Sequence, residues 1–155
     1  MPTQPSTYDD ANLILRLYEL RREELMRTAR QWFAANYHPA TIEEGMKIAP
    51  PGSQENAYAR MVCSYWEMAC SFVTSGVLNQ ELFFQSSGEM LGVWERMRGL
   101  LPAMREMSKN PAMFRNIETV GNAYAKWLEN NGPEAYAMFQ TMMKNMAQRA
   151  AAEKA

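Results

Sequence analysis

The sequence has 155 residues, the length of one domain, and 47% of them are apolar against 21% charged, which excludes a disordered chain. Valine and isoleucine number 5 and 4 against 20 alanines, 14 methionines and 11 leucines, a ratio that favours helix over sheet. The net charge of −1 indicates neither a nucleic-acid partner nor attraction to an acidic membrane. We therefore expect an all-α fold, a single-domain helical bundle of five or six helices.

Capping residues, prolines and glycines divide the chain into predicted helical segments with short loops between them. The first segment is expected to begin at Asp9 or Asp10, whose carboxylates can accept hydrogen bonds from free N–H groups. It is expected to end at Tyr37, because the residue before Pro39 disfavours helix. In chain order, the segments, some of them short, are 9–37, 41–48, 53–76, 79–99, 102–109, 110–130 and 133–149.

Residues suited to helix ends mark the later boundaries. Ser53 and Asn79 can cap the N-termini of two segments, and Gly76 suits the left-handed position that follows a helix. Asn110 followed by Pro111 is typical of an N-cap and a first helical residue. Residues 1–8 and 150–155 are expected to fray, so the chain is interpreted as one helical domain over residues 1–155.

Segment 53–76 lacks the charged face of a surface helix. Apolar side chains cover nearly half of its circumference, and the opposite side carries small residues together with Arg60 and Glu67. A helix that is apolar or small on all sides is usually buried, so we expect this segment at the centre of the bundle. Its apolar stripe comprises Met61, Tyr65, Met68 and Phe72.

Glu67 needs a partner if its helix is buried, because a buried carboxylate must be paired, hydrogen-bonded or protonated. We expect that partner to be Arg105, Arg98 or Arg115, and Glu118 could share the same arginine. A structural ion-pair network between helices is the first interpretation. The alternatives are a functional carboxylate with a shifted pKa and a side chain that reaches solvent.

His38 is the one histidine, which excludes sites that need two, such as the di-iron centres of helical bundles. It precedes a proline in a predicted turn, so a solvated loop residue is favoured over a catalytic base. On one helix, Cys63 and Cys70 would lie about 10.5 Å apart, beyond the limit of about 7 Å for a disulfide. We expect inert, reduced thiols, a cytoplasmic location, no metal site and no cofactor.

The last segment concentrates methionine on one side. Met138, Met142 and Met146 recur at helical spacing, with Phe139 and Met143 beside them. Such stripes pack in cores or form adaptable contact surfaces, and binding of Cu(I) by the thioethers is the remotest alternative. We expect this surface to mediate self-association, and the protein to be a homodimer.

Membrane attachment is not expected from this sequence. Residues 1–10 are polar and lack the charged and apolar regions of a signal peptide. No run approaches the roughly 18 apolar residues of a membrane span.

Several short motifs carry a resemblance: Tyr65-Trp66-Glu67, Trp94, Pro102-Ala-Met-Arg105, and Asn110-Pro111-Ala-Met-Phe114 continuing to Glu118. Together, from about Asp10 to Leu128, the chain resembles a family of small bacterial helical domains of unknown function. The resemblance implies an α-helical domain without an assigned activity, and it draws attention to Glu67, Trp94, Arg105 and Glu118. Some relatives carry an N-terminal membrane helix, which is not found in this sequence.

Three classes of function follow from these observations. The first is a non-catalytic interaction or scaffold domain. The second is a bundle that binds a small apolar ligand, since 17 aromatic residues and 14 methionines could line a cavity. The third is an enzyme that uses Glu67 as acid or base and Arg105 as an anion clamp.

Overall fold

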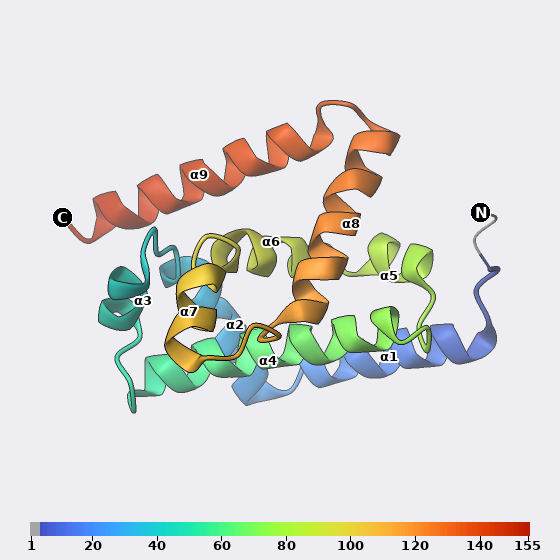
Figure 1. Cartoon of the computed structure of the whole chain (residues 1–155), viewed down its shortest axis with the longest axis horizontal. Coiled ribbons are helices and arrows are strands. Elements are labelled where there is room, and N and C mark those ends of the chain that lie inside the picture. The colour runs from blue at the N-terminus through green and yellow to red at the C-terminus, as the bar shows by residue number, and fades with distance from the viewer. Residues whose placement is uncertain (1–3) are drawn as a thin grey trace.

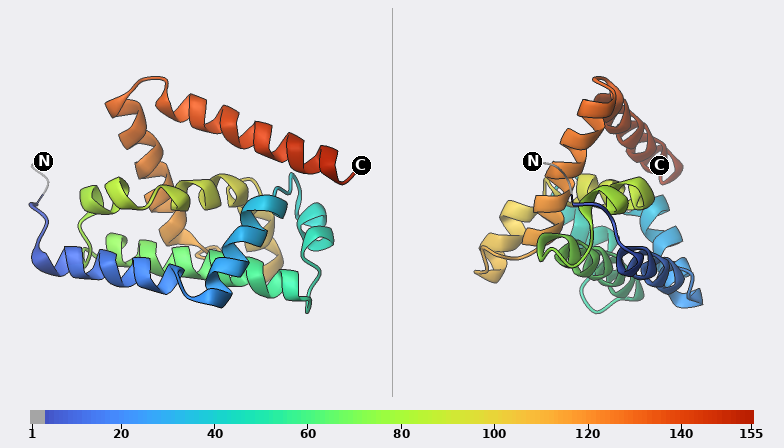
Figure 2. Two further views of the ribbon diagram at one scale, coloured as in Figure 1. Left: turned by 180° about the vertical axis from the view of Figure 1, so that it is seen from behind. Right: turned by 90° about the vertical axis from the view of Figure 1, so that its right-hand side faces the viewer.

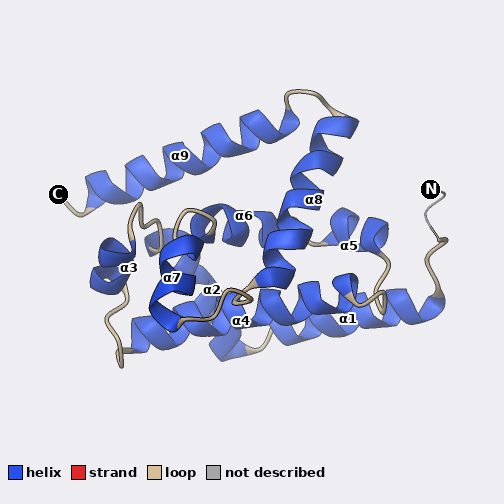
Figure 3. Ribbon diagram, in the orientation of Figure 1, coloured by secondary structure: helices blue, strands red, loops and turns tan. Residues whose placement is uncertain are grey.

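The computed structural model describes residues 4–155, and within them the chain forms nine α-helices and no strand (Figures 1 and 3). The predicted all-α fold is confirmed, whereas the prediction of five or six helices is wrong. Two of the additional helices arise because residues 9–37 and 79–99 each form two helices. The helices are α1 (Tyr8–Arg21), α2 (Glu24–Asn36), α3 (Ile42–Ile48), α4 (Gln54–Thr74), α5 (Gln80–Ser86), α6 (Gly88–Met97), α7 (Leu101–Ser108), α8 (Arg115–Asn131) and α9 (Ala135–Glu153).

The first break lies at Glu23, between α1 and α2. Glu23 has a non-helical backbone with ψ of 141°, and its carboxylate accepts hydrogen bonds from the N–H groups of Leu25 and Met26 at 3.0 and 2.9 Å. Glutamate is not among the preferred N-cap residues, and no glycine or proline marks this position. The capping rules therefore predict one continuous helix through Glu23, whereas the structure has two helices that meet there.

The other differences also lie at helix ends. Thr7, rather than Asp9 or Asp10, caps α1, and Asp10 completes a capping box with it. The break between α5 and α6 falls at the buried Ser87. Helix α9 extends to Glu153 and so includes part of the segment 150–155, whose fraying stays a prediction. Of the predicted N-terminal frayed segment, residues 1–3 lie outside the described residues.

Helix α4 packs against α2, α6 and α8. Figure 1 shows α1 beside α4 in one layer, α5 and α6 in the next, and α8 rising steeply from α4. The core between them includes the fully buried side chains of Trp66, Phe83, Met90 and Ile117. The expectation that α4 is buried on all sides is wrong, since Arg60, Ser64 and Met68 form an exposed strip along it.

Helix α9 returns from the end of α8 across the top of the molecule toward α3 (Figures 1 and 2). It packs against α8 and α6, yet none of its 19 residues is buried. Within residues 4–155, no helix is both long enough and apolar enough to cross a membrane.

Candidate functional site

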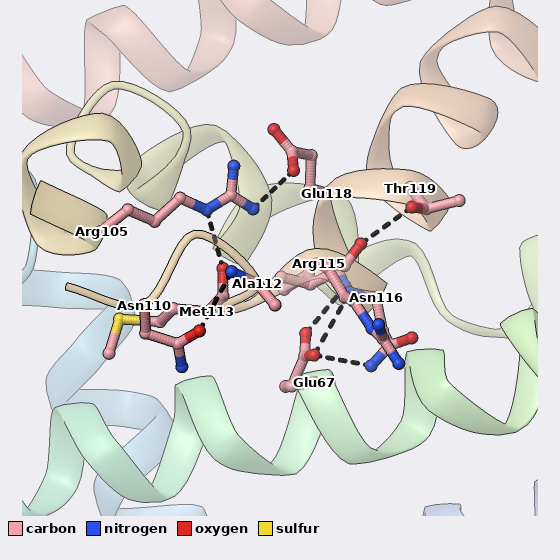
Figure 4. Close-up of polar contacts among 10 residues, drawn as sticks. Glu67, Arg105, Asn110, Ala112, Met113, Arg115, Asn116, Glu118 and Thr119 are labelled. Carbon is pink, nitrogen blue, oxygen red and sulfur yellow. Dashed lines mark hydrogen bonds and ion pairs between the residues drawn. The ribbon is translucent and has the colours of Figure 1, made fainter. Parts of the chain in front are cut away.

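Glu67 reaches from α4 to the first turn of α8. Its Oε1 accepts hydrogen bonds from the backbone N–H of Asn116 at 3.2 Å and from the Asn116 side-chain amide at 2.7 Å, and its Oε2 accepts from the N–H of Ile117 at 2.9 Å (Figure 4). The positive end of the α8 dipole favours a carboxylate there. The predicted arginine partner is therefore wrong: Glu67 serves as the N-terminal cap of a helix about fifty positions later.

This cap explains where α8 begins. Phe114, at the N-cap position, has φ of 54° and offers no side-chain hydrogen bond. Asn110 instead closes a turn by accepting from the N–H of Ala112 at 3.0 Å. The predicted start at Asn110 and Pro111 is wrong because the free N–H groups that Glu67 satisfies lie farther along, after Arg115.

Arg105 and Glu118 do meet, apart from Glu67. Arg105 Nη2 lies 2.6 Å from Glu118 Oε2, and Arg105 Nε donates to the Met113 carbonyl at 3.0 Å (Figure 4). This pair fastens α7 and the loop after it to α8. Arg98, another predicted partner of Glu67, contacts Glu95 and Tyr136. The predicted network is thus two separate contacts.

Trp94 lies in the interface between α6 and α8, where it is 3% exposed. A Cβ added to Gly121 of α8 would come within 2.4 Å of the indole ring, so the absence of a side chain allows the helices to approach. Trp94 contributes packing rather than a polar contact, since its indole nitrogen has no hydrogen-bond partner in the described structure.

Burial shifts the pKa of both thiols and of the imidazole. Burial raises the pKa of Cys63 to about 12, which keeps the thiol protonated, and it also raises the pKa of the buried Cys70. The ring nitrogen Nε2 of His38 lies 2.9 Å from the Ala34 carbonyl, so the side chain folds back onto α2. Burial, followed by the charge of Arg96, lowers the pKa of His38, and the ring is neutral at pH 7. Within residues 4–155, no three His, Cys, Asp or Glu side chains gather where they could hold a metal ion.

The predicted interaction surface on α9 divides into two sides. Met138 and Met142 point outward, 67% and 52% exposed, and we call these two residues the α9 outer face. Phe139 and Met143 point to α6, where the Met143 sulfur lies 3.9 Å from Arg96 Nη1 and Phe139 lies against Gly92. Met146 is half-buried between the two sides.

An apolar cavity of about 380 Å³ lies among α3, α4 and α7. Four methionines from three separate segments line it, together with Tyr37 and other uncharged residues. Burial raises the pKa of Tyr37 to about 12, so its hydroxyl stays neutral. The number of methionines and aromatic residues was the one sequence signal for such a cavity. The positions of its methionines follow no sequence pattern that could have located it. These methionines are Met46, Met104, Met107 and Met113.

Comparison with protein families gives a match over well over half of the chain. The family is described as a domain of unknown function (DUF4760), and the matched residues are 6–127. Comparisons with curated proteins and with solved structures give no match. The expected resemblance to a family of domains of unknown function is confirmed, with limits close to Asp10 and Leu128. The bacterial origin and the motif positions stay predictions.

Proposed function

This chain belongs to a family of domains of unknown function (DUF4760), and we propose that it is a non-catalytic interaction module that forms a homodimer through α9. The observation that carries the proposal is the exposure of α9. This 19-residue helix has no buried residue, and it presents two neighbouring methionines to solvent. Methionine side chains adapt readily to a partner surface.

A second copy of the chain is the partner that fits this helix. In an antiparallel pair centred on Met142, Met138 of one copy lies opposite Met146 of the other. The same register brings Glu134, at the start of the helix, beside Arg149 near the end of the partner helix. Opposite charges and opposite helix dipoles then meet at both ends of a self-complementary interface.

The dimer is expected to be weak. A helix of 19 residues is about 28 Å long, so one helix pair buries less area than a stable interface of standard size. Association in the micromolar range or weaker follows, and it should depend visibly on protein concentration.

The role of the polar groups supports a non-catalytic module. Both oxygens of Glu67 accept hydrogen bonds from the start of α8, and Arg105 is bound by Glu118 and the Met113 carbonyl. The residues of the enzyme alternative are thus engaged in holding helices together. A cytoplasmic location is part of the proposal, and the free thiols of Cys63 and Cys70 fit a reducing compartment.

Sedimentation equilibrium over a wide concentration range tests the homodimer. The wild-type chain should shift from monomer to dimer as its concentration rises, whereas Met142→Glu should stay monomeric because two carboxylates would face each other. Met68→Glu is the matched control, since Met68 is also exposed but lies on α4, away from α9. A wild-type chain that is monomeric at millimolar concentration would refute the proposal.

The apolar cavity favours a second candidate function, binding of a small neutral apolar ligand. A volume of about 380 Å³ and a lining without charged residues suit such a molecule. The neutral dye Nile red should gain fluorescence with the wild-type chain and lose that gain with Met104→Trp, which fills the cavity. Met68→Trp is the control. Equal Nile red fluorescence with both variants would exclude this cavity as the binding site of the dye.

A further inference from the structure

His38 lies between the end of α2 and helix α9, where it lines two neighbouring cavities. The first, of about 230 Å³, has walls from α6 and α9, and the second, of about 330 Å³, has walls from α3 and α9. From α9, Ala147 also lines both cavities. The imidazole therefore faces the C-terminal half of α9.

Helix α9 is attached to the rest of the chain mainly through its first half. The Tyr136 hydroxyl donates a hydrogen bond to Glu95 and accepts one from Arg98 Nη1 at 2.7 Å. Farther along α9, the residues that line the second cavity are three alanines and Lys154, and the short alanine side chains leave the cavity open: Ala147, Ala150 and Ala151. A helix held in this way can lift locally at its end while its start stays in place.

His38 and Arg96 share one hydrogen-bond acceptor. The Ala34 carbonyl lies 2.9 Å from His38 Nε2 and 3.2 Å from Arg96 Nη2, so both groups donate to the same oxygen. Arg96 Nη1 lies 3.9 Å from the Met143 sulfur on α9. The imidazole is thus connected to α9 through one arginine.

The charged groups that line the two cavities around His38 are mostly cations. Both carboxylates in the linings already accept hydrogen bonds, Glu44 from a backbone N–H and Glu95 from a phenol and an arginine. Glu89 also acts on Arg96, but Arg30 binds it with two hydrogen bonds. A positive charge on His38 would therefore meet more repulsion than attraction. The four cations are Arg96 of α6, Lys47 of α3, and Lys144 and Lys154 of α9.

We propose that His38 is a pH-sensitive switch for α9. Protonation of the imidazole places a second cation on the Ala34 carbonyl beside Arg96, and the C-terminal half of α9 then lifts away from α3 and α6. The switch does not depend on the homodimer, because every group in it belongs to one copy of the chain.

The titration of His38 fits this direction. Burial first, and then the charges of Arg96 and Lys154, lower the pKa of His38 from its ordinary value of 6.5, against the opposing effect of the Ala34 carbonyl. A histidine with a lowered pKa contributes stability that is fully present above pH 6.5 and is lost as pH falls through the folded pKa. The attached position of α9 is therefore favoured at neutral pH and weakened in acid.

Hydrogen exchange measured by mass spectrometry on the full chain tests the switch between pH 7.5 and pH 5.0. Each exchange rate is divided by the chemical rate at the same pH, which gives a protection factor. In the wild type, the protection of residues 144–153 should fall at least threefold at pH 5.0, while that of α4 stays constant. His38 is the one histidine, so no other side chain has its ordinary pKa within this range.

Two variants that do not titrate in this range serve as controls. His38→Gln and His38→Asn keep an amide that can donate to the Ala34 carbonyl, and the protection of their α9 should not change with pH. The measurements are repeated in the Met142→Glu background, so that a change in dimer formation does not imitate the switch. Constant protection of α9 in the wild type, or an equal fall in the wild type and both His38 variants, would overturn the proposal.

Discussion

Asp10 shows how much one carboxylate can contribute at a helix terminus. It is 7% exposed and accepts hydrogen bonds from the Thr7 N–H at 2.7 Å, the Thr7 hydroxyl at 2.8 Å and the Asn79 N–H at 2.7 Å. Asp10 therefore closes its own capping box and also joins the start of α1 to the start of α5. These hydrogen bonds, those from the Thr7 and Asn79 backbone first, lower the pKa of Asp10 below its ordinary value of 3.8.

The lowered pKa of Asp10 predicts a specific dependence of stability on pH. A depressed carboxyl pKa contributes stability that is fully present above the unfolded pKa of 3.8 and is lost as pH falls through the folded pKa. Asp10→Asn should therefore melt at a lower temperature than the wild type at pH 7, and the gap should narrow below pH 3.8. Thermal melts at several pH values measure this, and a gap that stays constant down to pH 2 would contradict it.

At the scale of elements, the contact between α6 and α8 depends on one missing side chain. Gly121→Ala should destabilise the fold by about 1–3 kcal/mol, because the new Cβ would lie 2.4 Å from the buried Trp94 ring and force the helices apart. Urea unfolding measures the loss. Gly99→Ala is the control, since nothing lies within 4 Å of its added Cβ. Equal stability of the two variants would show that α6 and α8 can separate at little cost.

Helix ends set by neighbouring residues could be predicted from sequence, and ends set by distant residues could not. The caps at Ser53 and Asn79 are confirmed, as is the left-handed Gly76 with φ of 77°, because each depends on contacts within four residues. The predicted start of α8 is wrong because its capping carboxylate lies on another helix. Local rules do not predict the break at Glu23 because an unusual residue acts as the cap.

At the scale of the whole molecule, composition predicted the helical class correctly, but the arrangement of side chains in space decided the sites. The sequence predicts that Glu67 and Glu118 share an arginine such as Arg105. Arg105 and Glu118 do form an ion pair, whereas Glu67 accepts hydrogen bonds from the backbone of α8.

The proposed dimer contact lies outside the family match. The match ends at residue 127, before α9 begins at Ala135. The proposed contact therefore belongs to a part of this chain that the family comparison does not cover.

The cap that Glu67 places on α8 has a consequence for the order in which the chain is synthesised. Translation produces α4 before α8, so the carboxylate is already present when the amide groups of Asn116 and Ile117 leave the ribosome. A rearranged gene that encoded α8 ahead of α4 would reverse this order. Its nascent helix would then start at Pro111 by the local rules, and it would have to unwind by about one turn when Glu67 arrived.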